Sequence, residues 1–191
     1  MGSNDYQFLT VWRVHATPQE VVDVLSDASD LPRWWPSVYL EARIVEGGDA
    51  NGVGRVVDLW TKGWLPYTLR WRFRVTESDP PRTISLEAAG DFVGRGVWTF
   101  TLEEATPGAG PVTHIEYDWR VSAEKQLLKL LSPVMRPFFG ANHRWAMAQG
   151  ERSLRLELAR RRAAGDPTVL DALPPPPGPT FDLRRRRQPP A

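Results

Sequence analysis

Three polar side chains stand at positions where the sequence is otherwise apolar, and each could do chemistry on a bound molecule. Asn142 and His143 lie in a C-terminal segment with a helical apolar stripe, and His143 is four residues from both Phe139 and Met147. An imidazole can act as an acid or a base near neutral pH; the other interpretation for His143 is a hydrogen-bonded structural residue. Arg55 alternates in phase with apolar residues of a predicted strand, so its side chain would need a carboxylate or a ligand anion.

Residue patterns that mark metal, phosphate and covalent chemistry are missing from this sequence. The chain has no cysteine, and its 3 histidines fall on separate predicted elements, so we expect neither a metal nor another cofactor. Two Gly-x-Gly segments, 52–54 and 94–96, lead into strands rather than helices and lack the other residues of a phosphate loop. No Gly-x-Ser-x-Gly nucleophile elbow occurs, which argues against covalent hydrolysis.

The charge and hydropathy of the chain set limits on its partners and location. Among 191 residues, 24 are Lys or Arg and 23 are Asp or Glu, which gives a formal net charge of +1. This balance provides no general attraction to nucleic acid, so we expect no nucleic-acid partner. No segment approaches the roughly 18 apolar residues of a membrane span, and the N-terminus lacks a signal-peptide pattern. We therefore expect a cytoplasmic protein, and the excess of Arg over Lys indicates a GC-rich bacterial genome.

A change of composition near residue 165 divides the chain into two parts. Residues 165–191 are rich in proline and have no periodic apolar pattern, so we predict a disordered Pro- and Arg-rich tail after a folded domain at 1–164. Two runs in this tail could bind partners: Pro174–Pro177 a polyproline-recognising module, and Arg184–Arg187 an anionic surface. The simpler interpretation is a solvated tail without a partner.

The apolar patterns before the tail predict an α+β protein. Residues 6–16 are rich in aromatic and β-branched side chains and predict a strand, which two short helices follow at about 18–27 and 30–36. The first helix begins with a capping box, Thr17-Pro18-Gln19-Glu20. Strand-length runs divided by turn residues then predict an antiparallel meander, at 38–46, 53–62, 67–77, 82–89, 95–104 and 112–122. A long helix follows over 123–164, with a break or kink near Pro133 and Pro137.

Three of the predicted strands have one aromatic face and one polar face. An antiparallel sheet with one face in water has this pattern, so the aromatic faces should point inward. The inward aromatic residues expected from these strands are Tyr67, Trp71, Phe73, Trp98, Phe100, Tyr117 and Trp119. We expect Arg70, Arg72 and Arg74 on the outer face, paired with residues such as Asp58 and Glu87. A bulge in the strand would instead turn these arginines into the interior.

Several short phrases and the order of elements resemble one known superfamily. The phrases are ATPQEVVDVLSD at 16–27, LPRWWP at 31–36 and RVTESDPPRTI at 74–84. They are similar to the polyketide cyclase/dehydrase and lipid-transport group of the START-like or Bet v 1-like (SRPBCC) superfamily, and the likeness covers residues 6–162. The resemblance implies a helix-grip fold: a seven-stranded antiparallel curved sheet wrapped around a long C-terminal helix, with two short helices after the first strand. It also implies a ligand cavity between sheet and helix.

The resemblance further suggests which residues act on a ligand. In the aromatic polyketide cyclases a tyrosine at the place of Tyr39 lines the cavity, and such a phenol could orient or protonate a bound carbonyl. The other interpretation for Tyr39 is a core tyrosine bonded to backbone. These cyclases are also thought to use an inward arginine on the strand that matches 67–75, where alternation places the arginines of this sequence outward. Arg55 is therefore the better inward candidate.

Two functions are consistent with these residues. The first is binding of a hydrophobic or polycyclic small molecule, by walls that include Trp35 and Asn142 besides the inward aromatic residues. The second is a polyketide cyclase or dehydratase that acts on poly-β-ketone intermediates, with Tyr39, Arg55 and His143 as the groups that transfer or polarise protons. The apolar segment 127–139 is either a lid that transiently contacts a membrane or a helix start packed on the sheet.

Overall fold

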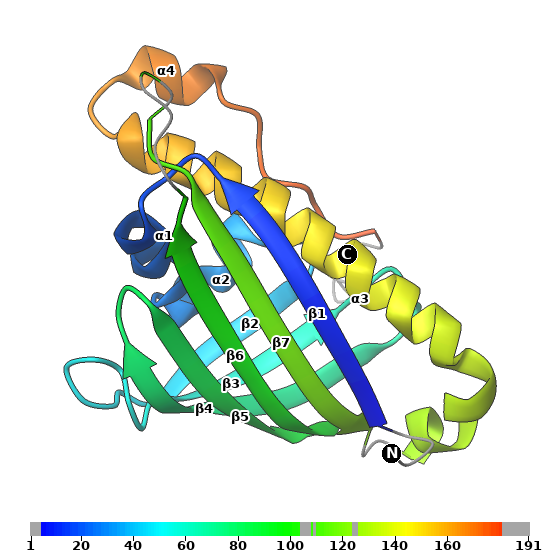
Figure 1. Cartoon of the computed structure of the whole chain (residues 1–191). Coiled ribbons are helices and arrows are strands. Elements are labelled where there is room, and N and C mark those ends of the chain that lie inside the picture. Colours follow the sequence, from blue (N-terminus) through cyan, green and yellow to red (C-terminus); the bar gives the residue numbers. More distant parts are fainter. Residues whose placement is uncertain (1–4, 104–107, 109, 124–125, 181–191) are drawn as a thin grey trace, which may run out of the picture.

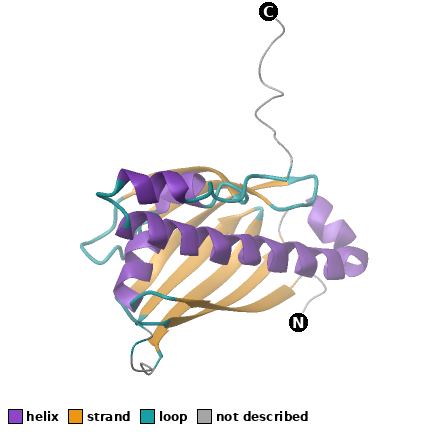
Figure 2. Cartoon of the chain, turned by 90° about the horizontal axis from the view of Figure 1, so that it is seen from above, coloured by secondary structure: helices purple, strands orange, loops and turns teal. Residues whose placement is uncertain are grey.

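Seven antiparallel strands form one curved sheet, and a long helix packs against one of its faces (Figures 1 and 2). The computed structural model describes residues 5–103, 108, 110–123 and 126–180, without the side chains of 123–136. The strands are β1 (Asp5–Val14), β2 (Tyr39–Glu46), β3 (Val56–Lys62), β4 (Thr68–Asp79), β5 (Thr83–Gly90), β6 (Phe92–Leu102) and β7 (Thr113–Ala123). Their order across the sheet is β1-β7-β6-β5-β4-β3-β2, so β1 closes the meander against β7. The predicted α+β helix-grip fold is confirmed.

Short helices connect β1 to β2 and close one end of the sheet. They are α1 (Pro18–Leu25), η1 (Ala28–Asp30) and α2 (Leu31–Trp34). The predicted capping box is present: the backbone N–H of Glu20 donates to Thr17 Oγ1 at 3.2 Å, and Glu20 Oε2 accepts from the Thr17 N–H at 2.7 Å. These bonds satisfy amides that the first turn of a helix leaves unpaired, and so fix where α1 begins.

The long helix α3 (Gln126–Arg162) crosses the sheet and supplies one wall of the interior. Its apolar stripe reaches the core at Met147, Leu154 and Leu158, which are all buried. Gly150 permits the closest approach, because a Cβ there would lie 2.2 Å from Trp35 Cζ2, nearer than atoms can pack. In Figure 1 the first turns of α3 bend away from the rest of the helix, in the region of the predicted proline kink.

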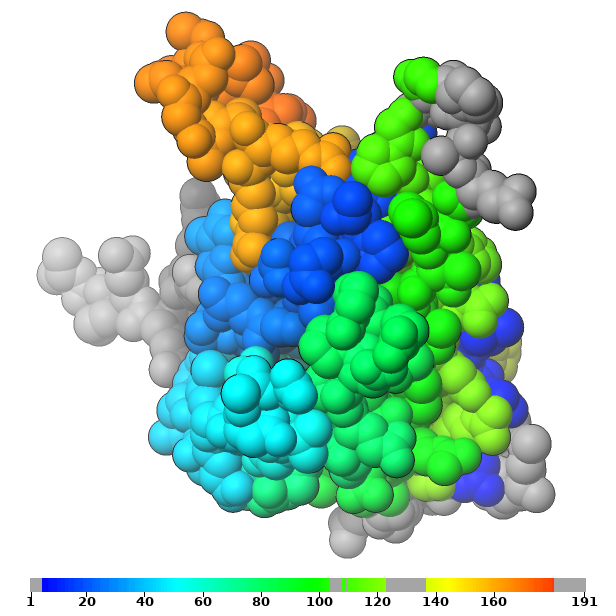
Figure 3. Space-filling model, turned by 60° about the vertical axis from the view of Figure 1, so that its left-hand side comes forward, coloured from blue at the N-terminus to red at the C-terminus, as the bar shows by residue number. Residues whose placement is uncertain are grey.

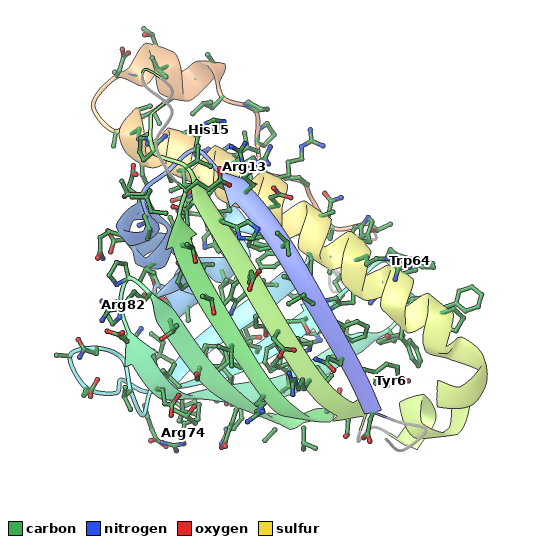
Figure 4. All side chains as sticks on the ribbon, viewed as in Figure 1. Tyr6, Arg13, His15, Trp64, Arg74 and Arg82 are labelled. Atoms are coloured by element: carbon green, nitrogen blue, oxygen red, sulfur yellow. The ribbon has the colours of Figure 1, made fainter. Side chains whose placement is uncertain are left out.

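The two faces of β4 differ as the alternation predicted. Its arginines lie on the outer face, where Arg72 pairs with Asp58 at 2.7 Å and Arg74 with Glu46 at 3.0 Å. Figure 4 shows Arg74 on the outside of the sheet. The pairing of Arg72 with Asp58 was expected, whereas Arg74 pairs with β2 across the turn before β3 rather than with β5. The inward alternative for these arginines is therefore wrong.

The segment after α3 contains structure that its composition did not predict. Residues 167–172 form the short helix α4 (Pro167–Ala172), whose N-cap Asp166 accepts from the Thr168 N–H at 3.0 Å. The N-cap at Asp166 stabilises the first turn of this helix by accepting from its free backbone N–H groups, although the segment has no periodic apolar pattern. The chain then returns beside α3 (Figure 1), where the Arg160 guanidinium donates to the Pro174 carbonyl. Arg184–Arg187 fall outside the described residues.

Most of the segment 127–139 lies outside the described side chains, so its two interpretations stay open. Of its last residues, Phe138 is 48% exposed, whereas Phe139 contacts the rings of Tyr6 and Tyr67. Within the described residues, no helix is both long and apolar enough to cross a membrane.

Candidate functional site

Two adjoining cavities lie between the sheet and α3, and together they form the candidate site. Cavity 1 has a volume of about 110 Å³ and cavity 2 of about 190 Å³. Five side chains line both cavities, and we call the region between the cavities that they border the waist: Trp35, Tyr39, Trp71, Tyr117 and Met147. Because the same residues bound both spaces, a ligand larger than either cavity would have to pass the waist.

The other walls come from opposite ends of the sheet. Cavity 1 is further lined by Leu25, Ser26, Ala28, Leu31, Asn51, Gly52, Arg55, Phe73, Val75, Ser78, Ile84, Leu86 and Trp98. Cavity 2 is further lined by Tyr6, Phe8, Val38, Thr61, Lys62, Gly63, Tyr67, Leu69, Phe92, Trp119, Val121, Phe139, Asn142, His143 and Ala146. The face on which cavity 1 opens is formed by α1 and η1, the loop 47–55 and the turn between β4 and β5, which meet in Figure 3.

Ring contacts hold the waist residues in place. Tyr117 stacks on Trp98 with ring centroids 3.9 Å apart, and Trp35 meets Tyr39 edge to face at 5.1 Å. The Trp71 indole N–H donates to Thr61 Oγ1 at 3.0 Å, which fixes the orientation of that ring. Such aromatic pairs add about 1 kcal/mol each beyond the area that they bury. The waist is therefore a rigid, preformed aromatic surface.

Tyr39 and Tyr117 bring two phenol groups to the waist. Burial raises the pKa of Tyr39 well above its ordinary value, and burial together with the nearby Tyr39 raises the pKa of Tyr117. Both phenols therefore stay protonated throughout the neutral range. They can donate a hydrogen bond to a ligand oxygen, but they cannot act as bases there.

His143 lines cavity 2 from α3. Its Nε2 lies 3.3 Å from Thr10 Oγ1, and its ring stacks on Phe8 at 4.2 Å. Burial, aided by the charge of Arg144, lowers the pKa of His143 to about 4. The imidazole is therefore neutral near pH 7 and only weakly basic.

Asn142 also lines cavity 2, but its side-chain oxygen already accepts hydrogen bonds from the protein backbone. Asn142 Oδ1 accepts from the backbone N–H groups of Trp64 at 2.9 Å and Leu65 at 3.3 Å. Figure 4 shows Trp64 beside α3. Gly63 has no room for a side chain, because a Cβ would lie 2.1 Å from Asn142 Oδ1. Asn142 thus fastens the loop between β3 and β4 onto α3 at the edge of cavity 2.

Arg55 lies at the outer end of cavity 1. Its Nη1 donates to the carbonyl of Ser26 at 2.7 Å, and its Nε donates to the carbonyl of Gly47 at 3.0 Å. The sequence had suggested that a carboxylate or a ligand anion must accompany an inward Arg55. The structure gives it two neutral carbonyl acceptors from the protein instead.

The structure distributes the expected ligand-binding residues over three places. Phe73 and Trp98 line cavity 1, Tyr67, Trp119 and Asn142 line cavity 2, and Trp35, Trp71 and Tyr117 form part of the waist. Phe100 is not among the lining residues of either cavity; it is 4% exposed and packs in the core beside Trp98. The alternation of residues along a strand shows which side chains point inward, but it does not distinguish a core position from one that lines a cavity.

Sequence reasoning missed Phe92 and Lys62, which both line cavity 2. Phe92 was hidden by the glycines around it, since Gly90, Gly94 and Gly96 suggest a turn. In the structure Gly90 ends β5, and β6 runs through Gly94 and Gly96. Glycine is needed at 96 because a Cβ there would lie only 2.7 Å from Trp119 Cε3. Lys62 is 4% exposed and ends β3; alternation along that strand gave no signal of its burial.

Possible metal ligands do not gather in the described part of the chain, where no group of three or more His, Asp or Glu could hold an ion. The histidines are spread out: His15 lies near the end of β1, far along that strand from Tyr6 (Figure 4), whereas His143 lies on α3.

The fold is shared with proteins of known structure. The crystal structure of the Zhui aromatase/cyclase from Streptomyces sp. R1128 is 21% identical, with a TM-score of 0.64 over 84% of this chain and 98% of that one. The di-domain ARO/CYC BexL from the BE-7585A biosynthetic pathway is 18% identical, with a TM-score of 0.57 over 87% of this chain and 52% of that one. Ara h 8.0201 is 15% identical, with a TM-score of 0.51 over 81% of this chain and 97% of that one.

Sequence comparison assigns the family. No curated protein matches this chain in sequence. Residues 8–157 match the family described as polyketide cyclase / dehydrase and lipid transport, which is most of the folded domain. The protein therefore belongs to the polyketide cyclase/dehydrase and lipid-transport family.

Proposed function

We propose that the protein binds a hydrophobic, polycyclic small molecule of polyketide or lipid type in the two cavities, with its flat part at the waist. The walls support this, because rigid aromatic surfaces bind flat apolar molecules without being reorganised. The family and the aromatase/cyclase relatives favour a polyketide-like ligand.

One observation carries the binding function ahead of catalysis: three polar side chains of the cavity 2 wall, Asn142, Thr61 and His143, are hydrogen-bonded within the protein, and none is a strong acid or base. Asn142 holds the β3–β4 loop, Thr61 accepts from Trp71, and His143 is a weak base. An enzyme needs polar groups that converge on a reacting atom and have a pKa suited to proton transfer. A carrier or sensor needs only the apolar surface.

Catalysis is the second candidate, and the phenols at the waist are the observation that favours it. A protonated Tyr39 or Tyr117 could donate to a carbonyl oxygen of a poly-β-ketone and make its carbon more electrophilic. The α carbon of an enol of the same chain would then attack that carbon, so that a C–C bond forms as the carbonyl π bond breaks. The phenol would give its proton to the former carbonyl oxygen and regain one from the enol hydroxyl. In this mechanism the cavity supplies the folded shape of the substrate, which brings the two reacting carbons together.

Native mass spectrometry of the purified protein, followed by extraction and identification of any bound molecule, tests the binding function. We expect a mass increase that corresponds to a hydrophobic compound of a few rings or a long chain. A protein that is always recovered empty and that binds no added polycyclic probe would contradict the proposal.

A matched pair of tryptophan variants tests the position of the ligand. Trp71→Ala removes a waist ring, and we expect the affinity for the neutral probe 1-pyrenebutanol to fall roughly tenfold or more in a fluorescence titration. Trp60→Ala is the control, because Trp60 lies on the same sheet but on its outer face, beneath Arg70. Equal affinity in both variants, with folding intact, would exclude the waist as the binding surface.

Substitution of Tyr39 by Phe separates the two candidates. If the protein is a cyclase, Tyr39→Phe should slow the conversion of a supplied poly-β-ketone by roughly 10²-fold or more without weakening its binding. If the protein is a carrier, wild type and variant should bind the same compound and neither should convert it.

A further inference from the structure

Arg55 is a positive charge at the outer end of cavity 1 that the protein orients but does not neutralise. Two backbone carbonyls, of Ser26 and Gly47, accept from its Nη1 and Nε. A guanidinium group has five N–H donors and keeps its charge at all pH values at which proteins fold. The two bonds therefore fix the plane of the group and leave further N–H donors for another acceptor.

Among the described residues, no carboxylate forms an ion pair with Arg55, although Asp27, Glu46 and Asp49 lie close in sequence to Arg55 or to its acceptors. Each of these has another partner. Asp49 Oδ1 accepts from the backbone N–H of Asn51 and of Val53, both at 2.9 Å. Asp27 Oδ1 accepts from Ser29 Oγ at 2.6 Å, and Glu46 pairs with Arg74.

Arg55 thus differs from the arginines of the outer sheet face. Arg72 and Arg74 each have a carboxylate partner in water, where such a pair contributes little. Arg55 is half-buried and lines a cavity, where its charge is less well solvated and would be stabilised by an anion.

The surroundings of Arg55 make a short polar rim in front of an apolar space. Ser26, Asn51 and Ser78 line the same end of cavity 1. Gly52 lies directly beneath the guanidinium group, since a Cβ at Gly52 would be 3.5 Å from Arg55 Cζ, and its φ of +85° favours glycine. Beyond this rim the wall is apolar as far as the waist, with Phe73, Ile84 and Leu86.

We propose that this end of cavity 1 binds a carboxylate, so that the preferred ligand is an amphipathic acid whose head pairs with Arg55 and whose apolar body reaches the waist. This inference rests on the proposed binding function and names the chemical class of its ligand. The backbone carbonyls of Ser26 and Gly47 hold the guanidinium group in position before the ligand arrives, which lowers the entropic cost of binding.

Two probes with the same polycyclic body test the proposal: 1-pyrenebutyric acid, which is ionised at pH 7, and the neutral 1-pyrenebutanol. In fluorescence titrations at low salt we expect the wild-type protein to bind the acid roughly tenfold more tightly than the alcohol. Arg55→Gln should abolish this preference by weakening the binding of the acid much more than that of the alcohol. Arg95→Gln is the matched control, because it removes the same charge from the exposed outer face of β6 and should keep the preference.

Two further measurements keep the proposal testable if Arg55→Gln does not fold. Arg55→Lys should retain part of the preference, because it keeps the charge but loses the fixed planar donors. In the wild-type protein, a higher salt concentration should weaken the binding of the acid but not the binding of the alcohol. Equal binding of acid and alcohol by the wild type, or a preference that survives in Arg55→Gln, would overturn this inference alone. Failure of both probes to bind would instead overturn the proposed binding function and this inference with it.

Discussion

The inner face of β4 carries large aromatic residues that line the cavities, whereas its outer face carries charged residues of similar size that form ion pairs in water. On the inner face, Trp71 and Phe73 line the cavities and contact each other with ring centroids 6.3 Å apart. On the outer face, Arg72 and Arg74 form ion pairs and are about half exposed. Burial of apolar area contributes about 25 cal/mol per Å², whereas an exposed ion pair contributes about 0–1 kcal/mol.

This difference shows which substitutions the protein should tolerate. The inner face combines two tasks, since some of its residues hold the core and others shape the cavities. The outer face can change with little effect on stability.

The largest effect is expected inside, at a core residue that lines neither cavity. Phe100→Ala should lower the free energy of unfolding by about 3–5 kcal/mol in urea titrations, because it empties a fully packed site. Where the variant is folded, its affinity for 1-pyrenebutanol should match that of the wild type. The control is Thr101→Ala on the exposed face of the same strand, which should change stability by less than about 0.5 kcal/mol. Lost affinity in folded Phe100→Ala would place Phe100 in the cavity wall.

A smaller, pH-dependent effect is expected at His143. Its pKa in the folded protein is about 4, below the ordinary value of 6.5, so between these pH values the unfolded chain binds a proton that the folded chain does not. The neutral, buried state of His143 therefore costs the folded protein no stability above pH 6.5. Below that value the folded protein loses stability progressively as the pH falls towards 4. From pH 7 to pH 5 we expect the free energy of unfolding to fall by about 1–2 kcal/mol through this residue.

His143→Phe checks this assignment, because Phe can keep the stack on Phe8 but cannot titrate. The difference in stability between pH 7 and pH 5 should shrink by that amount in urea titrations of the variant. If wild type and variant lose stability equally over this range, His143 does not titrate as a buried group.

At the edge of cavity 2, Asn142→Ala should cost about 1–2 kcal/mol of stability, because two backbone amides lose their acceptor. Hydrogen exchange at Trp64 and Leu65 should become faster in this variant, as the loop is released from α3. Asn142→Asp is the control, since a carboxylate oxygen can accept from the same amides. Unchanged exchange at both positions in Asn142→Ala would show that other contacts hold the loop.

The smallest effect is expected outside, for the pair of Arg72 and Asp58. A double-mutant cycle with Arg72→Ala and Asp58→Ala should give a coupling energy of about 0.2–1 kcal/mol, which salt reduces further. Burial tends to raise the pKa of Asp58, but the hydrogen bonds that it accepts from Arg72 and Arg43 together outweigh this and lower the pKa, so its share of this stability should disappear in acid. A coupling of several kcal/mol would mean that the outer face contributes to stability as the inner face does.

Much of the fold could be predicted from local patterns. The capping box marked the start of α1, and the alternation in β4 assigned Trp71 to the inside and Arg72 to the outside. These features depend on neighbours a few residues apart, so the sequence carries them directly. The same reasoning missed Phe92, because a glycine-rich run reads as a turn when the opposing rings that need its space are not known.

Local patterns along the chain are enough to assign the order of elements, the inward and outward faces of the strands, and the resemblance to a helix-grip family. The division of the inward residues into cavity walls and core became visible in the three-dimensional structure. The structure also showed that Asn142 fastens a loop and that Arg55 has neutral acceptors. Periodicity can be recognised in a sequence because it arises from backbone geometry between near neighbours. A cavity, in contrast, depends on where residues distant in sequence meet across the core, as Trp35 and Gly150 do.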